Sequence, residues 1–65
     1  MSLKNEDPRV IRTKALITQA LVHLTDKTPY KKIKIQDITL TAEIARQTFY
    51  LHYKSKDAVL IDYID

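Results

Sequence analysis

The first half of the chain carries apolar residues at helical spacing. They lie three, four or seven positions apart and so share one helix face, at Val10, Ile17, Ala20, Leu21 and Leu24. Asp7-Pro8 favours a helix start, because Asp caps free N–H groups and Pro is tolerated at the first helical position. Pro29 cannot continue a helix and disfavours one at the residue before it, so we expect this helix to end by about Lys27.

Shorter apolar patterns predict two more helices in the middle of the chain. Ile35, Ile38 and Ala42 mark the second helix, with Asp37 in its first turn, where the helix dipole favours an anion. Before it, "YKKIKI" alternates as a strand would. The chain offers no second strand to pair with this segment, so we interpret it as a linker.

After a turn that contains Ile44, a third helix is expected from Ala45 to Leu51 or His52. Its inward side chains should be Thr48, Phe49 and Tyr53. Ser55 is a good N-cap for a fourth helix, with Asp57 in its first turn. The expected apolar stripe of that helix is Val59, Leu60, Tyr63 and Ile64.

The pattern therefore predicts an all-α fold, with three helices and the start of a fourth. Residues 1–8 lack periodicity and are expected to form a disordered arm. Residues 9–54 should form the domain proper, and residues 55–65 the start of the fourth helix. The apolar pattern of that helix is still running at Asp65, so we expect the chain to continue into a further, C-terminal domain.

Composition narrows the classes of function. The 65 residues include no Cys and no Gly, which excludes disulfides, thiolate metal sites and a Gly-rich phosphate loop. His23 and His52 are far apart in sequence, so neither a metal nor a cofactor is expected. No apolar run is long enough to span a membrane, and the absence of Cys fits the cytoplasm. Without a nucleophile–base pair or paired carboxylates, an enzyme is not expected.

Charge is concentrated in one segment of the chain. Residues 9–56 hold ten Lys and Arg against three acidic residues, a net charge of +7, whereas residues 1–8 carry −1 and residues 57–65 carry −3, which sum to the total of +3. Such a segment is typical of a polyanion binder, although a Lys-rich solvated surface would look the same. A basic module that docks an acidic protein or a membrane surface, without sequence preference, is the alternative interpretation.

The second and third helices are separated by a turn of about three residues, as in a DNA-binding helix-turn-helix. In that motif the second helix enters the major groove with its N-terminal residues at base edges. Arg46 and Gln47 stand at those positions, and Arg can bond bidentately to guanine and Gln to adenine. Tyr50 and His52 could reach phosphates, and Lys54 and Lys56 flank the start of the fourth helix, which also favours a phosphate.

The segment "IKIQDITLTAEIARQTFYLHYKSKDAVL" resembles the N-terminal domain of the TetR/AcrR family of transcriptional regulators. The matching residues are Asp37-Ile38, Ala42, Ile44, Thr48-Phe49-Tyr50, His52-Tyr53 and Ser55-Lys56, with Thr13, Ile17, Ala20, Leu24 and Tyr30 upstream. The resemblance implies sequence-specific binding of double-stranded DNA by a ligand-responsive repressor. It also implies a palindromic operator, a homodimer formed through a C-terminal domain, and a small-molecule inducer bound by that domain.

The resemblance completes the set of expected contacts. Base contacts are expected from Ala45, Arg46 and Gln47. Contacts to the DNA backbone are expected from Arg12, Thr13, Lys34, Thr48, Tyr50, His52, Lys54 and Lys56.

The chain also departs from the family pattern. Pro29 and Glu43 replace glycines, and Lys34 and Ala45 replace Ser or Thr helix caps. Glu43 would cost about 1 kcal/mol relative to Gly if its φ is positive, and each missing cap costs about 1 kcal/mol. Lys34 could exchange capping for a phosphate contact, and Ala45 retains a methyl group for a thymine.

Overall fold

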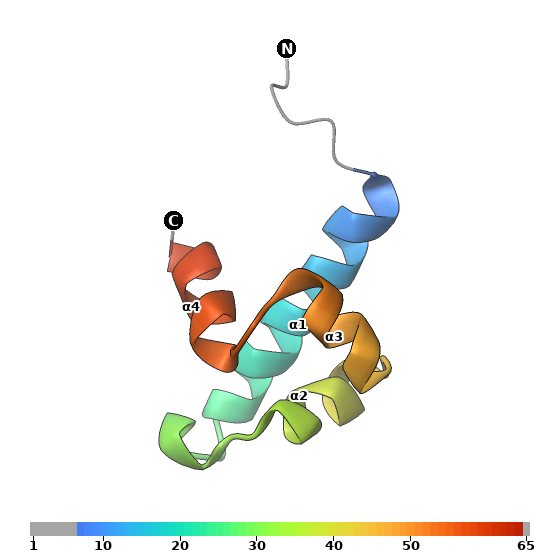
Figure 1. Cartoon of the computed structure of the whole chain (residues 1–65). Coiled ribbons are helices and arrows are strands. Elements are labelled where there is room, and N and C mark those ends of the chain that lie inside the picture. The colour runs from blue at the N-terminus through green and yellow to red at the C-terminus, as the bar shows by residue number, and fades with distance from the viewer. Residues whose placement is uncertain (1–6, 65) are drawn as a thin grey trace.

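A computed structural model describes residues 7–64, which fold into helices joined by short turns (Figure 1). The elements in chain order are α1 (Pro8–Thr25), the 3-10 helix η1 (Tyr30–Lys32), α2 (Ile35–Ala42), α3 (Arg46–His52) and α4 (Lys56–Ile64). The described residues contain no strand, which confirms the all-α prediction. The expected arm lies largely outside the described residues, and its last residue, Pro8, belongs to α1 instead.

Helix α1 begins and ends where its flanking residues predict. The Asp7 carboxylate accepts a hydrogen bond from the Arg9 N–H at 2.8 Å, and Pro8 occupies the first turn, where no N–H partner is needed. The helix ends at Thr25, and the Thr28 N–H closes the last turn on the Leu24 carbonyl at 2.9 Å. In Figure 1, α1 is the long diagonal helix around whose lower half the other helices gather.

One core joins all the helices. Its buried residues are Ile17, Ala20 and Leu21 of α1, Ile33, Ile38 and Ala42 around α2, Phe49 and Tyr53 around α3, and Val59 of α4. Most were expected from spacing, but Ile33, in the linker, and Thr39 are also buried. The Thr39 hydroxyl tolerates burial because it donates to the Gln36 carbonyl at 3.0 Å. Burying each large side chain contributes about 1.5–3 kcal/mol, which compensates for the short helices.

The helix starts differ in how they are capped. The Lys34 side chain has no acceptor atom and cannot cap α2, but the Asp37 carboxylate accepts from the Lys34 N–H at 2.9 Å. Ala45 precedes α3 without a side-chain cap, as expected. The Ser55 hydroxyl accepts from the Ala58 N–H at 3.2 Å, so the predicted cap of α4 is confirmed.

Helix α2 ends in a left-handed residue. Glu43 has φ 60° and ψ 45°, its N–H donates to the Leu40 carbonyl, and the next N–H, from Ile44, donates to the Thr39 carbonyl at 3.0 Å. This pair of bonds is the Schellman motif, which normally places Gly at the left-handed position. Pro29, by contrast, has φ −56°, so no Gly is needed there.

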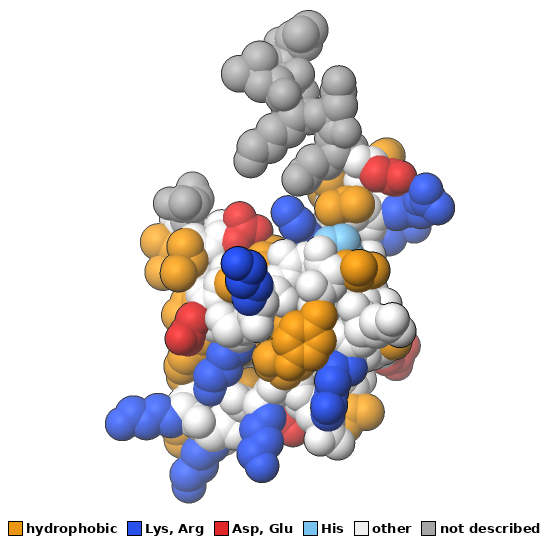
Figure 2. All heavy atoms as spheres, in the orientation of Figure 1, with side chains coloured by type: hydrophobic (Ala, Val, Ile, Leu, Met, Phe, Trp, Pro, Cys, Tyr) orange, Lys and Arg blue, Asp and Glu red, His pale blue; other side chains and the backbone are white. Residues whose placement is uncertain are grey.

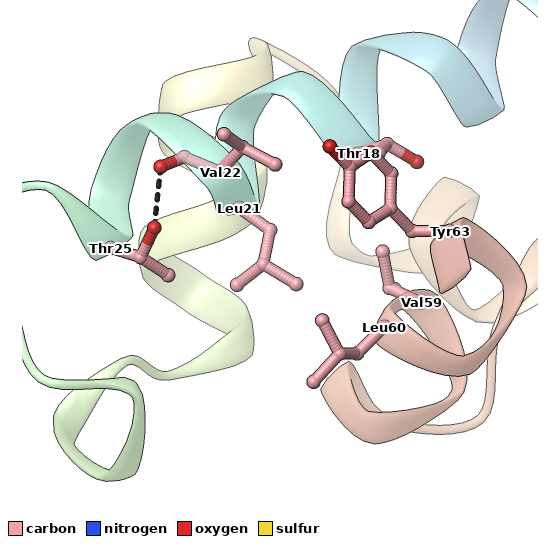
Figure 3. A pocket seen from close by; sticks show the side chains of 7 residues that line it. All are labelled: Thr18, Leu21, Val22, Thr25, Val59, Leu60 and Tyr63. Atoms are coloured by element: carbon pink, nitrogen blue, oxygen red, sulfur yellow. Dashed lines mark hydrogen bonds between the residues drawn. The ribbon is translucent and has the colours of Figure 1, made fainter.

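The stripe of α4 is only partly buried. Val59 is fully buried and Leu60 half-buried, whereas Tyr63 and Ile64, at the end of the stripe, are exposed. Tyr63 instead borders an apolar groove of about 240 Å³ between α1 and α4, across which side chains of the two helices face each other (Figure 3). None of the described helices is long and apolar enough to cross a membrane.

Candidate nucleic-acid interface

Helices α2 and α3 form a helix-turn-helix unit on α1. The turn consists of Glu43, Ile44 and Ala45, and the left-handed Glu43 turns the chain sharply between the two helices. Both helices contact α1, and they contact each other. The expected three-residue turn is therefore present, and α3 is held on the core rather than projecting as an isolated helix.

Phe49 determines which side of α3 faces outward. Its side chain is fully buried, and successive residues of a helix turn by about 100° around the axis. Gln47 therefore points almost directly away from the core, and Arg46 and Tyr50 lie together on one flank. All three are exposed, and so is Ala45 just before the helix. The structure thus leaves Ala45, Arg46 and Gln47, the residues expected to contact bases, exposed.

Tyr50 is held at the edge of this surface by an aromatic contact. Its ring meets the Phe49 ring edge-on, with centroids 5.5 Å apart and planes at 85°. Such a contact fixes the ring while 52% of the side chain stays exposed. The phenolic O–H has no hydrogen-bond partner within residues 7–64, so it can donate to an external acceptor such as a phosphate oxygen.

The residues expected at the DNA backbone lie around this surface with different degrees of exposure. Four of these residues are exposed, namely Arg12, Lys34, Tyr50 and Lys54. The other four are half-buried, namely Thr13, Thr48, His52 and Lys56. The fold brings Thr13 and His52 together, because both line a shallow hollow of about 270 Å³ between the start of α1 and the end of α3. The Thr13 hydroxyl already donates to the Arg9 carbonyl at 2.9 Å, so it could meet a phosphate only through a different rotamer or a water.

Positive charge on this side of the molecule is not neutralised internally. In the lower half of Figure 2, basic side chains gather around the face formed by η1, α2 and α3. Within residues 7–64, no ion pair engages Lys31, Lys32, Lys34, Arg46 or Lys54. Asp37, the acidic residue of α2, is directed back to its own helix start. A concentrated, unpaired positive surface attracts a polyanion.

Lys56 has a structural role that the sequence did not reveal. Its ammonium donates to the carbonyl oxygens of Tyr30 at 2.6 Å and Ile33 at 2.7 Å, and lies 4.3 Å from the centroid of the Tyr30 ring. The Tyr30 hydroxyl donates to Asp57. Burial raises the pKa of Tyr30 to about 12, together with the hydrogen bond to Asp57 and its negative charge. The phosphate contact expected of Lys56 stays a prediction, with one N–H left for it.

The described residues hold no group of three or more His, Cys, Asp or Glu that could bind a metal. The arrangement offers hydrogen-bond donors and positive charge around the exposed side of α3. The major groove of DNA is about 12 Å wide and admits one helix, so a helix exposed in this way is able to enter it.

Comparison with known proteins agrees with this geometry. The family model described as "Bacterial regulatory proteins, tetR family" matches residues 17–63. A Bacillus subtilis (strain 168) protein named "Uncharacterized HTH-type transcriptional regulator YxbF" is 41% identical over 58 residues, which are 88% of this chain and 15% of that protein. The Lactococcus lactis (strain IL1403) "HTH-type dhaKLM operon transcriptional activator DhaS" is 36% identical over 50 residues, 77% of this chain and 27% of that protein. No solved structure matches.

Proposed function

Because the chain belongs to the tetR family of bacterial regulatory proteins, a class of DNA-binding transcriptional regulators, we propose that it binds one operator sequence specifically, with α3 in the major groove. The observation that carries this proposal is the outward face of α3. Arg46 and Gln47, two side chains suited to bidentate base contacts, are exposed at its start, while Phe49 anchors the opposite side in the core. A surface built only for nonspecific charge attraction would not need these side chains at a helix start.

In the proposed complex, base contacts and backbone contacts have separate tasks. Arg46 bonds to a guanine, Gln47 to an adenine, and the Ala45 methyl meets a thymine. The backbone contacts set register and supply most of the nonspecific affinity. They come from Lys34, Tyr50 and Lys54 around α3, from Lys56 by its remaining N–H, from Thr48 and His52 on the half-buried flank, and from Arg12 and Thr13 on α1.

The regulatory cycle is proposed at the level of the whole protein. The chain spans 15% and 27% of the lengths of the two relatives, so most of each relative lies outside the match, and we propose that this protein has a separate C-terminal domain. We propose that such a domain forms a homodimer, binds a small-molecule inducer and thereby releases DNA, so that the protein represses transcription. Two α3 helices related by a twofold axis would read a palindromic site. The Lactococcus relative is named an activator, so the direction of regulation needs its own reporter measurement.

Selection of bound sites from a random duplex library by the full-length protein tests the proposal. A palindromic consensus with half-sites about one helical turn apart, or a multiple of that, is the expected result. Competition with heparin and with unselected duplex then measures specificity, for which a ratio of about 10³ or more is typical of specific binders. Equal binding to selected and unselected DNA would reject the proposal in favour of a basic module that recognises polyanions by charge alone.

A further inference from the structure

The most exposed large apolar side chain of the described residues lies on the recognition helix. Leu51 of α3 is 77% exposed, more than Ile64 at 74% or Leu40 at 69%. A single exposed Leu is common on protein surfaces and needs no explanation by itself. Leu51 differs from Ile64 and Leu40 because it lies on α3, the helix proposed to enter the major groove.

Leu51 shares the outermost line of α3 with Gln47. At about 100° per residue, each of the two points about 160° away from buried Phe49, on either side of the direction opposite to the core. Residues four apart are neighbours on one helix face. Arg46 and Tyr50 lie on one flank, and half-buried Thr48 and His52 lie on the other. Leu51 therefore lies beside Gln47 on the outermost side of α3, one turn further along the helix.

The helix is short enough for Leu51 to reach the bases. Its seven residues extend over about 10 Å, less than the roughly 12 Å width of the major groove. Gln47 and Leu51 are about 6 Å apart along the axis. Because base pairs are stacked about 3.4 Å apart, a helix seated with Gln47 at one pair places Leu51 one or two pairs away.

We infer that Leu51 is a specificity-determining residue that recognises the C5-methyl group of a thymine. A Leu side chain can neither donate nor accept a hydrogen bond, so it cannot read the polar pattern of a base. The thymine methyl is the one apolar group that a base edge presents in the major groove. This inference rests on the proposed function, and it adds a reader beyond Ala45, Arg46 and Gln47.

Removing the methyl group from DNA tests the assignment directly. Using the consensus selected by the full-length protein, each thymine is replaced by deoxyuridine, symmetrically in both half-sites, and binding is measured for the native protein and for Leu51→Ala. At one position, the native protein should bind the uracil site about fourfold more weakly per half-site, the equivalent of one buried carbon group. Leu51→Ala should bind thymine and uracil equally at that position and resemble the native protein at every other.

Two further variants show whether the effect comes from impaired folding or from the loss of any exposed apolar side chain. Leu51→Gln retains length and helix propensity and should also lose the methyl preference, with an unchanged melting temperature for both variants because the side chain is exposed. Ile61→Ala, on α4 and 63% exposed, should keep the preference. The sensitive thymine should lie within two base pairs of the position at which Gln47→Ala relaxes selectivity.

The possible failures are distinguishable. A consensus with no thymine in the half-site, or a thymine-to-uracil ratio that Leu51→Ala and Leu51→Gln leave unchanged at every position, overturns the assignment of Leu51 and leaves the proposed function intact. Failure to select any consensus overturns both. Loss of the methyl preference in Ile61→Ala would overturn the assignment as well, because the effect would then not be specific to α3.

Discussion

The ammonium group of Lys56 lies 4.3 Å from the centroid of the Tyr30 ring and donates a 2.6 Å hydrogen bond to the carbonyl of the same residue. A second bond, to the Ile33 carbonyl at 2.7 Å, extends the contact along the linker between α1 and α2. Asp57 adds to it by accepting from the Tyr30 hydroxyl. Two adjacent residues at the start of α4 thus hold the linker that leads into the helix-turn-helix unit.

Replacing Lys56 by Ala should destabilise the domain by about 1–3 kcal/mol, because two charge-assisted hydrogen bonds and a cation–π contact are lost from a half-buried site. Lys54→Ala is the matched control, since Lys54 is exposed and two residues away, and it should change stability by less than about 0.5 kcal/mol. Urea unfolding followed by circular dichroism measures both. Equal stability of the two variants would show that the Lys56 contacts contribute nothing.

The same variants test whether Lys56 also meets a phosphate. If its remaining N–H does so, Lys56→Ala should weaken binding to all DNA sequences alike and reduce the slope of log K against log salt concentration by about one. Lys54→Ala should do the same if its expected contact exists. A slope that changes for Lys54 and not for Lys56 would assign Lys56 to the fold alone.

Stability should fall in alkaline solution through the titration of Tyr30. Its pKa is raised from 10 to about 12 in the folded chain, so the unfolded chain loses the proton first as the pH rises. The stabilisation is complete below pH 10 and is lost as the pH rises through 12. Tyr30→Phe should cost about 1 kcal/mol at neutral pH, through the lost bond to Asp57.

The measurement for Tyr30 is a pair of unfolding curves at several pH values, for the native chain and for Tyr30→Phe. The difference between their free energies of unfolding should shrink between pH 10 and 12. A difference that stays constant across this range would contradict the assignment. Tyrosinate ultraviolet absorption gives a second readout, because the step near pH 12 should become smaller in Tyr30→Phe.

Glu43→Gly should stabilise the domain by about 1 kcal/mol, because a residue with a Cβ atom is strained at φ 60° and Gly is not. Glu43→Ala is the control: it removes the same charge but keeps the Cβ atom, so it should bring no comparable gain. Thermal unfolding of the three proteins separates the two effects. A gain of equal size in both variants would trace the effect to the charge of Glu43 instead of its backbone.

Arg46→Ala and Gln47→Ala should each cost about 1–3 kcal/mol of binding on the selected operator and relax the base preference at one position. Tyr50→Phe should lower affinity for operator and random duplex by the same factor, because it removes only a phosphate donor. Gln19→Ala, exposed on α1, serves as the matched amide control and should bind as the native protein does. Equal losses on operator and random DNA for Arg46→Ala or Gln47→Ala would place that side chain at the backbone.

Local rules were sufficient to locate the helices and most of the core. Several helix starts and stops follow from neighbouring residues, such as Asp7 with Pro8, Pro29, or Ser55, and most inward residues follow from a period of 3.6. The outward side of α3 could be derived in the same way once Phe49 was assigned to the core. The outward position of Leu51 also follows from that period. Sequence reasoning did not select it as a base contact because it looked for side chains that form hydrogen bonds.

Contacts between distant segments could not be derived from local rules. Lys56 and Tyr30 are 26 residues apart in the sequence. They meet only because η1 packs against the start of α4. As a result Lys56, which was expected to contact a phosphate, donates hydrogen bonds to two backbone carbonyls. Packing likewise buries Ile33 within a linker and leaves Tyr63 and Ile64 exposed on an otherwise regular stripe. Periodicity specifies which side chains share a face, whereas burial depends on whether another segment covers that face, and that is a property of the assembled chain.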